Sequence, residues 1–69
     1  MGKEAILKVL RNNPNKFFSQ KELSKLTKVN IPAVNTIIRK LMKEKEFYRI
    51  KTIQGKNESN NLITLYASY

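Results

Sequence analysis

Histidine and cysteine are both missing from this chain of 69 residues. Without cysteine there is no disulfide, and without either residue nearly every kind of zinc site is excluded. The lack of histidine also removes the usual general base of enzymes. The five acidic residues are all glutamates scattered among lysines, and no two are spaced like a catalytic pair. We therefore expect a protein that is not an enzyme and that binds neither a metal nor another cofactor.

Glycine and long apolar runs are scarce as well. Gly2 and Gly55 are the only glycines, so the chain has no glycine-rich phosphate-binding loop. No apolar run approaches the ~18 residues of a membrane-spanning helix. The N-terminus lacks the apolar core of a signal peptide. These absences predict an intracellular protein that has no membrane partner.

Positive charge is what the chain has in excess. Fourteen Lys and Arg against five Glu give a formal net charge of +9 and a pI of about 10.1 in 8.1 kDa. Such a charge indicates a polyanionic partner, although a lysine-rich surface can also serve solubility alone. With 41% hydrophobic residues the chain can form a core, and its length predicts one domain over residues 1–69. The positions of the lysines and arginines along the chain distinguish between these two explanations.

The first half of the chain contains signals for two helices. Residues 3–12 have apolar side chains at helical spacing, and Asn13-Pro14 ends that helix. Ser19-Gln20-Lys21-Glu22 has the form of a capping box, flanked by apolar residues spaced as a hydrophobic staple. This box predicts a second helix that runs to about residue 27. The apolar pair at 17–18 predicts a short strand before it.

The second half predicts a third helix followed by a β-hairpin. The helix covers about residues 30–45, because a proline such as Pro32 is tolerated in a first turn. The N-cap is Asn30 or, since a residue before proline avoids helical angles, Ile31. Aromatic and β-branched residues at 47–53 and 62–66 predict two strands. The polar stretch at about 54–61 is the loop between them.

The third helix has two chemically distinct faces. At about 100° per residue, four apolar side chains fall on one side and predict the face toward the core: Val34, Ile37, Ile38 and Leu41. The opposite side carries Pro32, Asn35, Thr36, Arg39, Lys40 and Lys43. It is either an ordinary solvated face or a contact surface for nucleic acid. Asparagine can pair bidentately with adenine, the threonine methyl can touch thymine, and arginine can reach guanine or phosphate.

The stretch Glu22–Leu41, which reads ELSKLTKVNIPAVNTIIRKL, resembles the winged helix-turn-helix superfamily, in particular small MarR-like and related prokaryotic or archaeal regulators. It aligns with the pattern of that family without a gap. The resemblance implies an α+β fold in the order helix, short strand, helix, helix, strand, wing loop, strand. It also implies binding of double-stranded DNA, with the third helix in the major groove and the wing on the backbone or minor groove. Such a protein is expected to be a small transcriptional regulator.

The resemblance further implies roles for individual residues. Positions that face the major groove in the family match Asn30, Ile31, Pro32, Ala33, Asn35, Thr36 and Arg39. Positions on or near the wing match Arg49, Lys51, Lys56 and Asn57. Three further lysines flank the helix and are expected to hold phosphates: Lys21, Lys25 and Lys28. Isoleucine at position 31 makes a base contact there apolar or absent. Glu46 stands where the family often has glycine, so the helix is expected to end differently.

Two other functions stay open at this point. A winged helix can bind another protein or RNA instead of DNA. A narrower resemblance, to the Z-DNA-binding domain of RNA-editing deaminases, is carried by Asn35, but Arg39 stands where that family has tyrosine. If the domain binds DNA, we expect a cytoplasmic, nucleoid-associated protein that is a monomer or a weak homodimer, with no small-molecule effector. Tyr66 and Tyr69 form either an exposed aromatic patch or, for Tyr66, a cover for the sheet.

Overall fold

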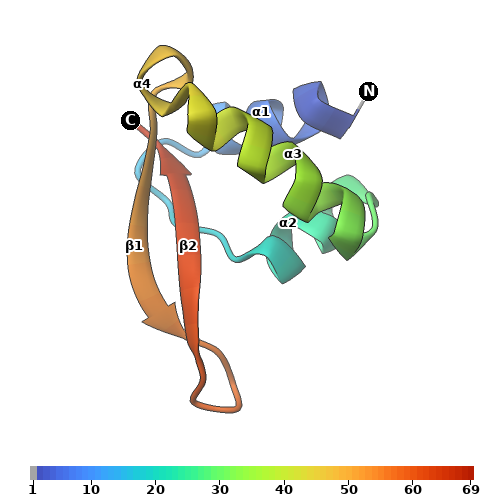
Figure 1. Cartoon of the computed structure of the whole chain (residues 1–69), viewed down its shortest axis with the longest axis vertical. Coiled ribbons are helices and arrows are strands. Elements are labelled where there is room, and N and C mark those ends of the chain that lie inside the picture. The colour runs from blue at the N-terminus through green and yellow to red at the C-terminus, as the bar shows by residue number, and fades with distance from the viewer. Residues whose placement is uncertain (1) are drawn as a thin grey trace.

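A computed structural model describes residues 2–69 of the chain. Its elements are α1 (Gly2–Asn12), α2 (Gln20–Thr27), α3 (Ile31–Lys43), α4 (Lys45–Tyr48), β1 (Ile50–Lys56) and β2 (Leu62–Ser68). The three longer helices form a bundle, and the hairpin of β1 and β2 runs along its side (Figure 1). The loop of the hairpin, residues 57–61, projects away from the bundle as a wing. This is the α+β architecture that the sequence predicts.

Side-chain caps begin the second and third helices where the sequence places them. The Ser19 hydroxyl accepts a hydrogen bond from the Glu22 N–H at 3.1 Å, and the Glu22 carboxylate accepts one from the Ser19 N–H at 3.1 Å. Asn30 caps α3, since its Oδ1 accepts from the Ala33 N–H at 3.0 Å. Of the two possible caps, Asn30 is therefore the one used, and Ile31 is already helical. Such caps satisfy N–H groups that the helix itself leaves unpaired.

The segment after α3 corrects the prediction. The helix expected to reach residue 45 ends at Lys43, and the strand expected from residue 47 begins at Ile50. The short helix α4 lies between them and ends at Tyr48, and its C-cap Arg49 has left-handed backbone angles (φ 58°). Aromatic side chains explain the extra turn, because Tyr48 is half-buried against the core and Phe47 packs edge-on against its ring. Periodicity within the segment does not reveal this contact.

The hairpin has an antiparallel register that runs from Ile50↔Ser68 to Lys56↔Leu62. A third segment touches its free edge, where Phe18 and Tyr66 exchange two backbone hydrogen bonds of 2.8 Å. The strand predicted at 17–18 is thus an isolated bridge and not a full strand. β2 extends past the predicted residue 66 to Ser68, whose carbonyl accepts from the Asn15 N–H at 2.8 Å. β1 extends past the predicted residue 53 to Lys56, so the wing loop covers residues 57–61 and is shorter than the predicted 54–61.

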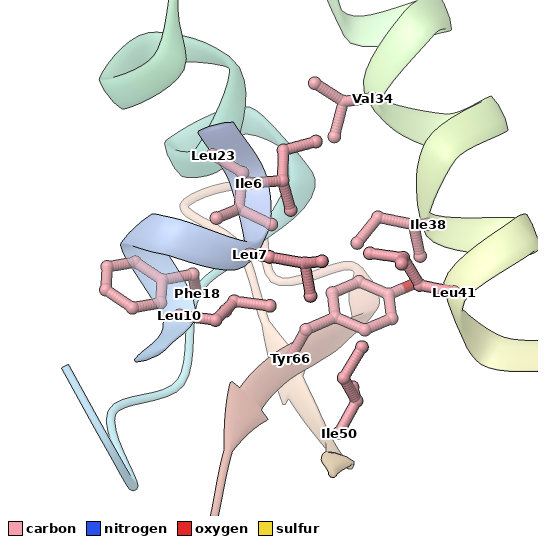
Figure 2. Close-up of a cluster of buried hydrophobic side chains, with 10 residues drawn as sticks. All are labelled: Ile6, Leu7, Leu10, Phe18, Leu23, Val34, Ile38, Leu41, Ile50 and Tyr66. Carbon is pink, nitrogen blue, oxygen red and sulfur yellow. The ribbon is translucent and has the colours of Figure 1, made fainter. Parts of the chain in front are cut away.

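The apolar face of α3 is the centre of the core. Val34, Ile38 and Leu41 are buried, as predicted, and Ile37 packs at the edge of the cluster. Figure 2 shows Tyr66 and Ile50 reaching from the hairpin toward the side chains of the helices. Tyr66 is therefore a core residue that covers the sheet, whereas Tyr69 is exposed. With its apolar face held by this cluster, α3 turns its polar face outward.

Candidate nucleic-acid interface

The outward face of α3 is basic toward its C-terminal end. Thr36, Arg39, Lys40 and Lys43 are all exposed. Pro32 is exposed one turn before Thr36, and the Thr36 hydroxyl donates to the Pro32 carbonyl at 3.1 Å. This bond holds the hydroxyl against the helix backbone. The face thus offers cations on one half and short, mostly uncharged side chains on the other.

Residues at the start of α3 have partly structural roles. Asn30 is exposed, but its side-chain oxygen is engaged in the cap. Ile31 is a large apolar side chain that is 48% exposed. Ala33 is half-buried. Ile31 is therefore the largest exposed apolar side chain at this end of the helix.

Asn35 is half-buried and hydrogen-bonded to α2. The side-chain Nε2 of Gln20, the first residue of α2, donates to Asn35 Oδ1 at 3.3 Å. The same Nε2 donates to the Tyr66 hydroxyl at 3.3 Å. Sequence reasoning did not single out Gln20, because its only local signal is its place in the capping box. Its partners lie 15 and 46 residues further along the chain, so helical or strand periodicity in the sequence cannot predict these contacts.

Lysines of α2 and of β1 line a common hollow, which Glu22 and Glu58 also line. The hollow has a volume of about 520 Å³ and lies between α2 and the hairpin. Lys21 and Lys25 line it from α2, and Lys56 lines it from the end of β1. Lys28 is exposed in the turn between α2 and α3, where its backbone is left-handed (φ 61°). The fold therefore brings together three lysines that are far apart in the sequence.

Asn57 holds the wing loop in shape. Its Oδ1 accepts hydrogen bonds from the N–H groups of Ser59 at 2.9 Å and Asn61 at 3.0 Å. Asn60 has a left-handed backbone (φ 63°), which asparagine tolerates better than most residues. Asn57 also lines a crevice of about 380 Å³ together with Ile31 and Gln20. The wing is thus compact, and one side of it faces the start of α3.

Arg49 and Lys51 lie at the other end of the hairpin from the wing loop, next to α4 (Figure 1). Lys51 is five residues before Lys56 on an extended strand, which separates their backbones by about 17 Å. The Lys51 amine donates to Asn15 Oδ1 and lies 5.1 Å from the ring centre of Tyr69. It is also 5.8 Å from the ring of Phe17. The structure therefore does not bring these two cations together with the other predicted contact residues.

The remaining electrostatic features lie away from α3. The hydroxyl of Tyr48 raises the pKa of the Lys3 amine above its ordinary value by hydrogen bonding, and the Lys3 Nζ lies 4.9 Å from the centre of that ring. Within residues 2–69, no three acidic residues gather into a group that could hold a metal ion. No helix among those residues is long and apolar enough to cross a membrane. The basic surface around α3 is the feature that stands out.

Comparisons with known proteins bear on this surface. A family model described as winged helix-turn-helix DNA-binding matches residues 3–44, which include α2, α3 and all of α1 except Gly2. The fold is similar to that of a "possible transcriptional regulator" from Methanosarcina mazei Go1, with a TM-score of 0.78 and 21% sequence identity. That likeness covers 97% of this chain and 53% of the other, so this chain spans about half its length. No curated protein matches the chain.

Proposed function

Because the chain belongs to the winged helix-turn-helix DNA-binding family, we propose that it binds double-stranded DNA with α3 in the major groove and the wing on the backbone or minor groove. The observation that carries this proposal is the exposed cationic face of α3, formed by Arg39, Lys40 and Lys43, above a buried apolar face. The major groove admits an α-helix whose exposed side chains reach base edges. The three cations lie along the outward side of the helix. With the helix in the groove, they would be close to the phosphates that line its edges.

The proposed base contacts come from the N-cap of α3 and from the exposed side of the helix as far as Arg39. The Thr36 hydroxyl is bonded to the helix backbone, which leaves its methyl group for thymine. Arg39 has the planar fork that matches guanine or phosphate. Ile31, Pro32 and Ala33 supply apolar contacts at the N-terminal end, beside the exposed Asn30. Asn35 lies between these residues and Gln20, to which it is hydrogen-bonded.

The proposed phosphate contacts come from lysines around the helix. Lys21, Lys25 and Lys56 line the hollow between α2 and the wing, while Lys28, Lys40, Lys43 and the wing residue Asn57 are exposed. Eleven of the fourteen cations in the chain are lysines, which bind phosphate as point charges and discriminate bases poorly. We therefore propose an affinity that depends mostly on phosphates, with modest sequence discrimination by a single copy.

The biological role that we propose is that of a small transcriptional regulator. The similarity in fold to the "possible transcriptional regulator" from Methanosarcina mazei Go1 supports this role. Such a protein would act on DNA in the cytoplasm, at the nucleoid, as a monomer or weak homodimer. It would do so without a small-molecule effector and without catalysing a reaction.

An NMR titration with a short duplex at two salt concentrations tests the binding proposal. We expect the largest shifts at residues 30–43 and near Lys56. With about six phosphates neutralised, a plot of log K against log salt should have a slope near −5. Duplex RNA and single-stranded DNA serve as competitors. A domain that prefers one of them would be displaced from the labelled DNA duplex by that competitor at a lower concentration than by unlabelled duplex DNA. A salt-independent response, or no binding to duplex DNA in dilute buffer, would contradict the proposal.

A further inference from the structure

Gln20 uses its entire donor capacity on two oxygens from different elements. Its Nε2 carries two hydrogens, and one goes to Asn35 Oδ1 and the other to the Tyr66 hydroxyl, both at 3.3 Å. Tyr66 is only 7% exposed, so its hydroxyl is held by the core. Gln20 in turn is held at the start of α2 by the capping box of Ser19 and Glu22. The amide of Gln20 is thus anchored on the side away from Asn35.

This anchoring determines which atom of Asn35 remains available. A carboxamide has an oxygen that accepts and a nitrogen that donates, on opposite arms of one planar group. Since Asn35 Oδ1 bonds to Gln20, Nδ2 is on the arm that points away from it. Asn35 is half-buried, not buried, and lies one turn before the exposed Arg39. The atom that it can offer a ligand is therefore the donor.

We propose that Gln20 is a positioning residue that makes Asn35 a hydrogen-bond donor to base edges, so that the domain selects a base with an acceptor there. This inference rests on the proposed function. In the major groove, guanine presents two acceptors, N7 and O6, whereas cytosine presents only the N4 donor. The domain should therefore prefer guanine over cytosine at the position that Asn35 reaches. The bidentate pairing of asparagine with adenine, which needs a free Oδ1, is not the favoured contact.

The substitution Gln20→Glu reverses the polarity of the anchor. A carboxylate only accepts, so Asn35 has to turn its Nδ2 inward and its Oδ1 outward. An outward oxygen accepts from cytosine N4 and has no partner on guanine. A carboxylate in the first turn of a helix is also favourable, so α2 should be retained. We expect an initial preference of about fivefold for guanine, the value of one modest hydrogen bond, to become a preference for cytosine of similar size.

The experiment begins with duplexes recovered by the wild-type protein from a randomised pool. The position read by Asn35 is the one at which Asn35→Ala loses its base preference. Affinities are then measured on two duplexes that differ only there, with guanine or cytosine. Lys21→Gln is the matched control, because it changes the charge by the same amount as Gln20→Glu on the adjacent residue. It should weaken binding to both duplexes equally and leave their ratio unchanged.

Two further variants separate positioning from other effects. Gln20→Met keeps the length of the side chain but cannot donate, so the preference for guanine should fall toward none. In the Asn35→Ala background, Gln20→Glu should leave the ratio of the two affinities unchanged, since the residue that it acts on is gone. In the free protein, the NMR signals of the Asn35 side-chain amide should shift in Gln20→Glu and stay in place in Lys21→Gln.

The outcomes distinguish this inference from the function on which it rests. Duplex binding with a guanine preference that survives in both Gln20→Glu and Gln20→Met overturns the inference and leaves the proposed function intact. If the protein binds duplex DNA but Asn35→Ala changes no base preference, the inference is also overturned and the proposed function again stays intact. If the wild-type protein does not bind duplex DNA at all, the proposed function fails and the inference falls with it.

Discussion

Arg39 is the residue whose removal separates binding from folding most clearly. It is exposed on α3 and lies outside the buried cluster. Arg39→Ala should weaken duplex binding by about tenfold, in the range of one lost arginine contact to a base or phosphate. Its melting temperature should stay within a degree or two of the wild-type value, because exposed substitutions change stability little. Fluorescence anisotropy and circular dichroism measure the two effects.

The control for Arg39→Ala is Arg11→Ala, which removes the same charge from an exposed position on α1. It should lower the affinity for duplex DNA far less than Arg39→Ala does. If the two variants bound equally well, the assignment of α3 as the contact surface would be wrong.

Val34 is the opposite case, because it lies on the buried face of the same helix and is 0% exposed. Val34→Asp places an ionisable group in the core without a partner, which costs several kcal/mol. A domain of this size has a stability of roughly 5 kcal/mol, so the variant should be unfolded at room temperature. The control is Thr36→Asp, two residues further on the exposed face. Thr36→Asp should stay folded and lose affinity for DNA, and a folded Val34→Asp would contradict the helix orientation.

At the scale of the element, the side chain of Asn57 helps to hold the wing loop, together with backbone hydrogen bonds between residue 57 and residues 60 and 61. Asn57 accepts two backbone hydrogen bonds inside the loop. Asn57→Ala should therefore free the loop, lower the stability by about 1 kcal/mol and speed amide exchange at Ser59 and Asn61. It should also weaken duplex binding modestly, because a mobile wing has to be ordered on contact. Hydrogen exchange followed by NMR measures the first effect, and anisotropy the second.

The control for Asn57→Ala lies in the same loop. Asn60 has a left-handed backbone, and glycine adopts that conformation without steric cost. Asn60→Gly should leave both the exchange rates and the affinity close to wild type. Fast exchange in Asn60→Gly but not in Asn57→Ala would show that the loop is held in another way.

The two ends of the hairpin should contribute differently to binding. Lys56 lies beside the wing and lines the hollow opposite Lys21, whereas Arg49 lies at the far end, next to α4. Lys56→Gln should lower the slope of log K against log salt by about one, the effect of one lost phosphate contact. Arg49→Gln should leave that slope unchanged. Equal losses in the two variants would show that DNA follows the whole length of β1.

At the scale of the whole molecule, positive charge dominates, and the charge of the side chains hardly varies near neutral pH. The chain has a net charge of +9 and lacks histidine and cysteine, the side chains that titrate between pH 6 and 8 or just above. The pKa of Lys3 is raised, so the folded state holds this proton more strongly than the unfolded state does. The resulting stability is present throughout the neutral range and is lost only as the pH rises through the alkaline pKa of the folded state. Duplex affinity at constant salt should therefore change less than twofold between pH 6 and 8. A steep change, measured by anisotropy, would contradict this.

Local chemistry in the sequence determined most of the helical half of the protein. The capping box at Ser19–Glu22, the cap at Asn30 and the apolar spacing of Val34, Ile38 and Leu41 act over three to seven residues. Hydrogen bonds and helical periodicity of that range are visible in the order of residues. The same holds for the cationic face of α3, because it is the other side of the same helix. The assignment of that face to DNA stays a prediction.

Only the tertiary structure decided the features that depend on contacts between distant segments. The helix α4 forms where Tyr48 meets the core, Gln20 bonds to Asn35 and Tyr66, and Lys51 is held by Asn15 at the far end of the hairpin. In each case the partner lies many residues away or in another element. Its position follows from how helices and hairpin pack together, which neither local propensity nor periodicity encodes.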